Sequence, residues 1–241
     1  MKNEINNKTK KNIKFIFFDM EGTLFKKTVK VKHAKLAPGA WPLIAQHLGE
    51  KAMREEEATK QKWIEGKFAG YVEWMRETIK IHQKYGLTKE YFEKVMSKIE
   101  YHDGVKEVFA ELRKRNIQTG LVSGGFKAQA DRASKYLKID HAFAACEYYW
   151  GKDGKISHFN LLPCDYEGKT DFMKLIMKEH GLKKEEGVFV GDGANDIHLA
   201  QAVGTSIAFN ASPSLQKVCT HVINQEEGKE DFRAVLKYLN F

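Results

Sequence analysis

The sequence lacks the long apolar runs that a membrane-spanning helix requires. Its longest candidates, such as Phe15 to Phe18, are far shorter than the roughly 20 apolar residues needed to cross a bilayer. Residues 1–12 are polar and lysine-rich, without the apolar centre of a secretory signal. We therefore expect a soluble, cytoplasmic protein with no membrane partner.

Cysteine is scarce, and its spacing fits neither a disulfide framework nor a zinc site. Three reduced structural thiols, as in a cytoplasmic protein, are therefore expected at Cys146, Cys164 and Cys219. Histidines also lack a recognisable ligand spacing. No metal-binding role is predicted for His33, His47, His82, His102 and His158.

Internal repeats and low-complexity linkers are absent as well. The 241 residues are 42% hydrophobic and 30% charged, a balance typical of globular proteins with a sizeable core. This length suits one domain of ordinary size with a modest insertion.

The positive charge is concentrated at the start of the chain. Residues 1–35 contain ten lysines and three carboxylates, which accounts for +7 of the net charge of +8. A basic segment can bind nucleic acid, but no aromatic residue interleaves with these first lysines and no nucleic-acid-binding motif follows. A flexible, solvated basic tail over residues 1–12 is favoured, and a nucleic-acid partner is unlikely.

Hydrophobic patterning divides the rest of the chain into three parts. Residues 13–18 are predicted to form a buried strand, and residues 38–101 have helical periodicity interrupted by glycines and turn signals. From residue 103 onward, helices alternate with strands. Helices are predicted at 105–115, 126–137, 169–180 and 195–202, with a short helix and a C-terminal helix later, and strands at 117–122, 142–150, 155–163, 187–192, 206–209 and 221–223.

This alternation predicts an α/β fold built on a parallel sheet with right-handed crossovers. The two strands on either side of residues 151–155 are expected to form a hairpin. The helical block interrupts the alternation after the first strand, so it is predicted to be an inserted cap. The expected domains are a core of 13–30 and 102–241 and a cap of 31–101.

Four separate segments carry polar groups suited to one phosphate site. Asp19, Ser123 and Asp192 each lie where a predicted strand stops, and parallel sheets gather function at those ends. The segments are Asp19-Met20-Glu21-Gly22-Thr23, Ser123-Gly124-Gly125, Lys169, and Gly191-Asp192-Gly193-Ala194-Asn195-Asp196.

In order and spacing, these segments resemble the haloacid dehalogenase superfamily, specifically its phosphoserine-phosphatase-like branch. The resemblance covers nearly all of the chain from about residue 13 to residue 241. It implies a Rossmann-like core with a C1-type helical cap inserted after the first strand.

Phosphoryl transfer requires a nucleophile, a proton donor for the leaving oxygen and positive charge around the phosphate. Asp19 is the candidate nucleophile and would form an aspartyl-phosphate. Glu21 would protonate the leaving alkoxide and then deprotonate the attacking water. Lys169 would supply a fixed ammonium to the phosphate and to Asp19.

Hard oxygen ligands predict Mg²⁺ as the cofactor, held by the carboxylates of Asp19 and Asp192 and by the backbone carbonyl of Glu21. The Ser123 hydroxyl and the Gly124 amide lie between a strand and a helix, where donors can hold an anion. Asn195 resembles the family residue that contacts phosphate. Asp196 would orient metal-bound water or Lys169 from behind the metal ligands.

The chain departs from the family pattern at two positions. Most relatives have aspartate where Glu21 stands, a change that keeps the carboxylate. Phosphoserine phosphatases usually place a glutamate where Thr28 stands, to hold the serine amino group. Arg76 resembles the cap arginine that holds the serine carboxylate, although a solvated helix arginine is an equal alternative. Lys26, Lys27, Lys30 and Lys32 suggest a substrate with extra negative charge.

Together these features predict a Mg²⁺-dependent phosphomonoester hydrolase, phosphoserine-phosphatase-like, that acts on a small phosphorylated metabolite. One alternative is a phosphatase or phosphotransferase for another such metabolite. Another is a non-catalytic protein on the same fold that binds anions or nucleic acid through its lysine-rich start.

Overall fold

The computed structural model describes residues 12–27 and 39–239. Apart from Asn12, the predicted basic tail lies outside the described residues. Thr28 and the expected boundary between core and cap at residues 30 and 31 lie outside them too. The domain division proposed from the sequence therefore remains a prediction.

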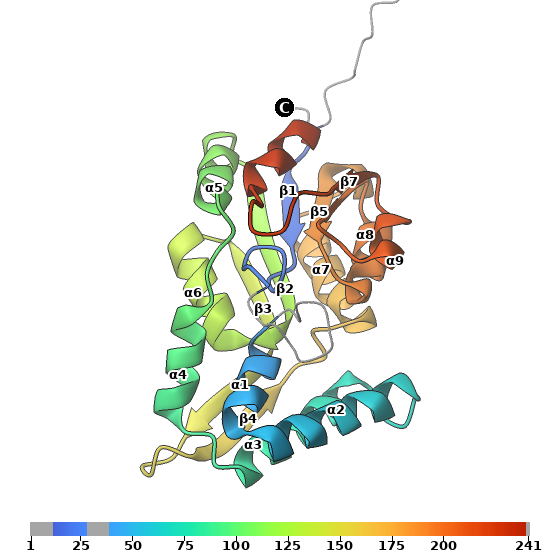
Figure 1. Cartoon of the computed structure of the whole chain (residues 1–241). Coiled ribbons are helices and arrows are strands. Elements are labelled where there is room, and N and C mark those ends of the chain that lie inside the picture. Colours follow the sequence, from blue (N-terminus) through green and yellow to red (C-terminus); the bar gives the residue numbers. More distant parts are fainter. Residues whose placement is uncertain (1–11, 28–38, 240–241) are drawn as a thin grey trace, which may run out of the picture.

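Seven strands and nine α-helices follow one another along the described residues (Figure 1). The strands are β1 (Phe15–Phe18), β2 (Gln118–Phe126), β3 (His141–Trp150), β4 (Ile156–Leu161), β5 (Gly187–Gly191), β6 (Thr205–Phe209) and β7 (His221–Ile223). The helices are α1 (Ala40–Leu48), α2 (Glu50–Ile64), α3 (Tyr71–Lys84), α4 (Lys89–Lys98), α5 (Val105–Lys114), α6 (Lys127–Leu137), α7 (Glu167–Glu179), α8 (Ile197–Ala202) and α9 (Pro213–Gln216). Short 3₁₀ turns are η1 (Lys184–Glu186), η2 (Ala194–Asp196) and η3 (Phe232–Tyr238).

The strands form one sheet in the order β4-β3-β2-β1-β5-β6-β7. All neighbouring strands are parallel except β3 and β4, which form the antiparallel hairpin expected around residues 151–155. The predicted α/β fold with a parallel sheet is therefore confirmed. Its central strand is β1, the first in the sequence.

Strand β1 is buried on both faces because helices cover both sides of the sheet. Ile16 and Phe18 face the layer of α5 and α6, where the rings of Phe18 and Phe109 lie 4.8 Å apart. Phe15 and Phe17 alternate to the other face and pack with α7 and α8. Figure 1 shows these two helical layers on opposite sides of the sheet. An entirely apolar strand is what such a position requires.

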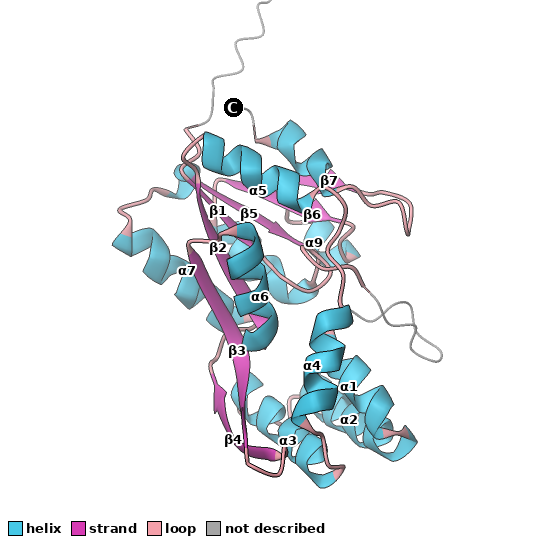
Figure 2. Cartoon of the chain, turned by 90° about the vertical axis from the view of Figure 1, so that its left-hand side faces the viewer, coloured by secondary structure: helices cyan, strands magenta, loops and turns pink. Residues whose placement is uncertain are grey.

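Helices α1 to α4 gather beside the β3–β4 hairpin, at one end of the molecule (Figure 2). Thr88, which caps α4, forms an isolated bridge with Lys155 of the hairpin. The Arg76 guanidinium of α3 lies 5.6 Å from the ring centroid of Phe159 in β4. The helical prediction for residues 38–101 is confirmed where residues are described, and the hairpin supports this group of helices.

Two predicted elements differ from the structure. Strand β2 continues through Ser123, Gly124 and Gly125 to Phe126, with a register shift against β3 between Ser123 and Phe126. Adjacent glycines weaken a strand and favour such irregularities, so their sequence signal resembles a strand end.

The C-terminal helix is a 3₁₀ helix, η3, rather than an α-helix. Its Phe232 and Val235 are fully buried, and residues three apart eclipse one another in a 3₁₀ helix. The Asp231 side chain caps its start by accepting a hydrogen bond from the Arg233 backbone N–H.

The fold bears on two expectations from the sequence, one about membrane-spanning helices and one about the cysteines. Across residues 12–27 and 39–239, no helix combines the length and the apolar character that crossing a bilayer requires. Cys146, Cys164 and Cys219 are all free thiols, as expected. Burial raises the pKa of Cys164 to about 12 and that of Cys219 to about 11, which keeps both protonated.

Candidate active site

Asp19 lies directly after β1, at the carboxyl end of the central strands. Its backbone N–H donates to the Val190 carbonyl of β5 over 3.0 Å, and its side chain is buried. The chain then turns sharply, because the N–H groups of Leu24 and Phe25 both bond back to the Met20 carbonyl. This turn projects Glu21 toward the same end of the sheet.

Lys169, near the start of α7, reaches this point as a fully buried side chain. Its Nζ lies 2.6 Å from Asp19 Oδ1 and 2.7 Å from Asp196 Oδ1. Burial by itself would lower the pKa of Lys169, but the neighbouring carboxylates hold it well above its usual range. Burial raises the pKa of Asp19, and the Lys169 ammonium opposes that shift. The arrangement gives Asp19 a permanent cationic partner.

Asp192 and Asp196 both belong to the loop that follows β5. Asp192 Oδ1 accepts a hydrogen bond from the Thr23 hydroxyl over 3.1 Å. Asp196 Oδ2 accepts the backbone N–H groups of Asp192 and Gly193 over 3.2 and 3.0 Å, while its other oxygen holds Lys169. Asp196 therefore links the loop to the buried lysine.

Three buried carboxylates could hold a metal ion. Oxygens of Asp19, Asp192 and Asp196 lie within 4.8 Å of one another, and hard oxygen donors of this kind suit a divalent cation. Here the Lys27 Nζ lies 2.7 Å from Asp192 Oδ2 and supplies positive charge at the same place. Burial raises the pKa of Asp192, and Lys27 opposes that shift. The donor set fits a divalent metal, which would replace Lys27 as the positive partner of Asp192.

Glu21 connects the loop after β1 to α1, the first of the helices α1 to α4, which are called the cap helices below. Its Oε1 accepts the backbone N–H of Ala40, the first residue of α1, over 2.9 Å. The preceding Gly39 has φ +108°, and a Cβ there would collide with the Glu21 carboxyl group. Burial raises the pKa of Glu21 to about 7, opposed by the Ala40 N–H. At neutral pH this carboxyl can therefore both donate and accept a proton.

The Ser123-Gly124-Gly125 segment lies beside these carboxylates. The Ser123 hydroxyl accepts the Gly125 N–H over 3.1 Å, and a Cβ on Gly124 would collide with the Asp165 carboxyl group. From the cap, the Tyr71 hydroxyl donates to the Gly124 carbonyl over 2.6 Å. The predicted phosphate loop thus contacts both core and cap.

Asp165 is a site residue that the sequence reasoning missed. Its Oδ1 accepts hydrogen bonds from Asn195 Nδ2 over 2.5 Å and from the Tyr166 N–H over 3.0 Å, and lies 3.7 Å from Lys169 Nζ. Burial raises the pKa of Asp165, and Lys169 opposes the shift. Asn195 and Lys169, two of the predicted phosphate contacts, therefore have the Asp165 carboxylate as a partner. Its oxygens are anionic, like those of the phosphate that these residues would bind.

No periodic signal marked Asp165, because it lies in the irregular segment before α7. Its spacing of four residues from Lys169 was the one available hint. The next residue, Tyr166, has φ +48° and ψ −127°, an unusual conformation for a bulky side chain. Backbone strain of this kind concentrates at functional sites.

The predicted residues surround one large cavity of 1340 Å³. Lys169 and Asp196 are buried behind its wall rather than on it. From the core, the lining includes Asp19, Glu21, Ser123, Gly124, Asp165, Asp192 and Asn195; from the cap, it includes Trp41, Met53, Arg54, Tyr71 and Trp74. The sequence motifs, which are far apart along the chain, are therefore brought to a single opening between core and cap helices.

Arg76 does not line this cavity. It is exposed, and its guanidinium lies over Phe159 instead. Tyr71, Met75 and Thr78 line the cavity from α3, and Arg76, the residue after Met75, points to another face of that helix. The substrate contact offered for Arg76 stays a prediction, since the structure places its side chain outside the cavity, as in the alternative of a solvated helix arginine. Arg54 of α2 lines the cavity instead.

The lysines after β1 are also engaged within the protein. Lys26 lies 3.2 Å from Asp103, and Lys27 pairs with Asp192 as described above. Lys30, Lys32 and Thr28 lie outside the described residues. Of the two lysines described directly after β1, Lys27 lies at the site and Lys26 does not.

Comparisons with known proteins agree with this geometry. Residues 13–204 match the haloacid dehalogenase-like hydrolase family. The phosphoserine phosphatase of Methanocaldococcus jannaschii is 29% identical over 95% of this chain and 99% of its own length. That of Archaeoglobus fulgidus is 30% identical over 88% of this chain, which spans 57% of that longer protein.

Solved structures show the same fold. A phospho-aspartyl intermediate analogue of phosphoserine phosphatase superimposes with a TM-score of 0.75, at 28% identity, covering 95% of this chain and 100% of that one. A substrate-bound phosphoserine phosphatase complex gives 0.74 at 28% identity, covering 94% and 98%. The chain belongs to the haloacid dehalogenase-like hydrolases, and within that superfamily it is phosphoserine-phosphatase-like.

Proposed function

We propose that this chain is a divalent-metal-dependent phosphomonoester hydrolase whose phosphoryl group passes through Asp19. The observation that carries the proposal is the buried contact of 2.6 Å between Lys169 Nζ and Asp19 Oδ1 at the cavity. A carboxylate fixed by a buried cation, beside donors suited to an anion, is arranged for nucleophilic attack on phosphorus.

In the first step, an Asp19 oxygen forms a bond to phosphorus while the bond from phosphorus to the ester oxygen breaks. Glu21 gives its proton to the departing alkoxide, which leaves as an alcohol. In the second step, the Glu21 carboxylate takes a proton from water that attacks the aspartyl-phosphate. Asp19 is regenerated and inorganic phosphate is released.

Several groups would hold the transferring phosphoryl oxygens. The Ser123 hydroxyl, the Gly124 N–H, Asn195 Nδ2 and Lys169 Nζ are the proposed donors. Asn195 is bonded to Asp165 in this structure, so phosphate binding requires Asp165 to give up that partner. Asp196 would act as a positioning residue through its contact with Lys169.

We propose Mg²⁺ as the metal, held by the carboxylates of Asp19 and Asp192 and by the Glu21 backbone carbonyl. The bound ion would neutralise these carboxylates and polarise a phosphoryl oxygen. Lys27, which pairs with Asp192 here, would move away when the ion binds.

The proposed substrate is a small phosphorylated metabolite, and phosphoserine is the first candidate because the similar proteins carry that name. Selectivity among substrates would come from the cap helices. Trp41, Arg54 and Trp74 of these helices line the cavity, so they would contact the leaving group of the substrate.

Phosphate release from a panel containing phosphoserine, sugar phosphates and p-nitrophenyl phosphate tests the proposal. We expect turnover with Mg²⁺, loss of turnover with EDTA, and no turnover by Asp19→Asn. Asp171→Asn, an exposed change on α7, is the matched control and should leave turnover intact. Mass spectrometry of a rapidly quenched reaction should detect a phosphoryl adduct on Asp19.

Turnover by Asp19→Asn equal to that of the wild type would refute the mechanism. Phosphoryl transfer to an added alcohol in preference to water would identify a phosphotransferase. If no compound is hydrolysed, and if DNA binding with a steep salt dependence disappears on removing residues 1–12, the protein is a non-catalytic binder.

A further inference from the structure

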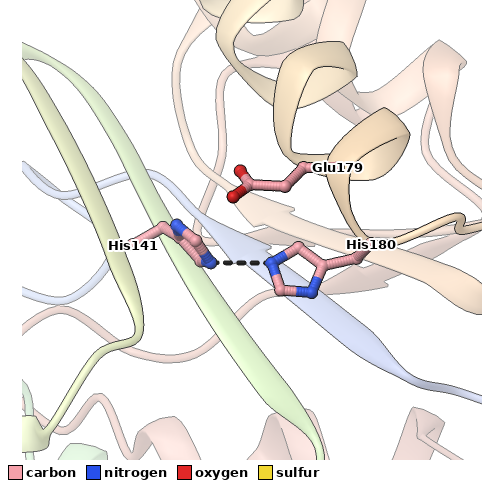
Figure 3. A group of neighbouring side chains, drawn as sticks. All are labelled: His141, Glu179 and His180. Atoms are coloured by element: carbon pink, nitrogen blue, oxygen red, sulfur yellow. Dashed lines mark hydrogen bonds between the residues drawn. The ribbon is translucent and has the colours of Figure 1, made fainter.

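A second group of possible metal ligands lies away from the active site. It consists of His141, Glu179 and His180, drawn in Figure 3. We propose that these three side chains form a site for a borderline transition-metal ion of the Zn²⁺ class, distinct from the acidic site at Asp19.

The three ligand groups come from two elements that meet at the amino-terminal edge of the sheet. His141 is the first residue of β3, Glu179 is the last residue of α7, and His180 follows it directly. The two imidazoles point at one another with 2.8 Å between their Nε2 atoms. The Glu179 carboxylate lies beside this pair of rings (Figure 3). One possible ligand atom from each of the three residues lies within 4.8 Å of the other two.

The donor set is specific in its chemistry. Two imidazole nitrogens and one carboxylate oxygen suit Zn²⁺, Ni²⁺ or Cu²⁺, whereas Mg²⁺ prefers oxygen ligands alone. In a tetrahedral Zn²⁺ site with Zn–N bonds of the usual length, the two nitrogens lie about 3.3 Å apart. Binding therefore requires the His141 and His180 nitrogens to separate by roughly 0.5 Å. Three protein ligands leave a fourth position for water.

A buried ring holds both histidines in place. The Phe15 ring centroid lies 6.0 Å from that of His141 and 5.7 Å from that of His180. Phe15 is fully buried at the start of β1, so the imidazoles rest against a rigid surface on one side. Both histidines are partly exposed and Glu179 is exposed, which leaves an entry path for an ion. Such preorganisation favours binding.

The cluster is separate from the catalytic residues. Phe15 begins β1, whereas Asp19 follows its other end, so the two sites lie at opposite ends of the same strand. A bound ion would connect the end of α7 to the start of β3. Because α7 carries Lys169 near its other end, the ion would also brace the helix that positions this lysine.

The competing explanation is a hydrogen bond between two neutral imidazoles, one donating to the other, with no metal. Calorimetric titration of the untagged full chain with Zn²⁺, in excess Mg²⁺ to occupy the acidic site, distinguishes the two. We expect one Zn²⁺ site that His141→Gln or His180→Gln weakens by more than about 10-fold, since even loss of an outer contact has that effect. His158→Gln, an exposed histidine on β4, should leave it unchanged.

Two further variants keep the test decisive. Glu179→Gln changes an exposed side chain, so it should fold normally and still weaken Zn²⁺ binding. Asp192→Asn removes a ligand of the acidic site and should leave the Zn²⁺ site intact. The intense visible absorption of tetrahedral Co²⁺ should appear in the wild type and vanish in His180→Gln.

Stability gives an independent readout. With Zn²⁺ at about 100 times its dissociation constant, the melting temperature should rise by roughly 5–10 °C. The rise should be absent in His141→Gln and present in His158→Gln. If the wild type binds no Zn²⁺, or if the two histidine variants bind it as tightly as the wild type, the proposal is wrong and the pair is a structural hydrogen bond.

Discussion

Replacing Lys169 with methionine tests whether the buried ammonium is the counter-charge on which the site depends. Methionine has a similar length and no charge, so the change removes the contacts of 2.6 Å to Asp19 and 2.7 Å to Asp196 while nearly filling the same volume. Lys169 is fully buried, so water cannot replace the lost partner.

The expected loss of stability follows from the burial of this pair. Removing one partner of a buried ion pair leaves an uncompensated charge and destabilises by about 3–5 kcal/mol. Asp19 and Asp196 share the same ammonium, so the two losses are not additive and this range applies to the whole substitution. For a chain of this size, the melting temperature should fall by about 6–20 °C.

The deficit should depend on pH with a definite sign. The pKa of Asp19 is raised in the folded protein, so the folded state binds its proton more tightly than the unfolded state does. Stability from this group therefore falls as pH rises above the ordinary carboxyl value of 3.8. Removing Lys169 takes away the opposing cation, so the deficit should be largest at neutral pH and smaller in acid.

Urea unfolding of the wild type and of Lys169→Met, at neutral and acidic pH, measures this difference. Lys174→Met, the same substitution at an exposed position on α7, should change stability by no more than about 0.5 kcal/mol. Added Mg²⁺ should recover part of the loss, because it returns positive charge to the carboxylates. Equal stability of the two variants at neutral pH would refute the reasoning.

Two further predictions concern Glu21 and the glycine packed against it. Glu21→Gln should lower kcat by about 100- to 10,000-fold, the usual contribution of a proton-transferring side chain. In the wild type, phosphoenzyme formation should slow as pH rises through about 7, because the protonated form of Glu21 is then lost; rapid-quench kinetics should find no such slope in the variant, and an unchanged slope would assign the proton transfer to another group. Gly39→Ala and Gly49→Ala place alanine at almost the same backbone angles, φ 108° and 103°, so each should destabilise by about 1–3 kcal/mol in thermal unfolding. Only the new Cβ at residue 39 meets the Glu21 carboxyl group, so only Gly39→Ala should also lower kcat, and an equal loss of activity in both would disprove the link.

The sequence alone determined the elements and their order, apart from the longer β2 and the 3₁₀ form of η3. Residues 15–18 are apolar because β1 is covered on both faces, and the cap helices show the amphipathic periodicity of helices that pack on one side. These signals are local, since each depends on residues only a few positions apart. The pairing of Asp19 with Lys169, 150 residues apart, was foreseen only because the order of the motifs resembles a known family.

Where no motif linked distant residues, only the tertiary structure decided which side chains became partners. Asp165 became a partner of Asn195, Lys27 a partner of Asp192, and Arg76 turned away from the cavity. His141 and His180 lie 39 positions apart with no spacing that predicts a site, yet the end of α7 and the start of β3 bring their nitrogens within 2.8 Å. Side-chain periodicity sets which face a residue occupies, but the packing of α7 and the cap helices against the sheet sets which charges meet there.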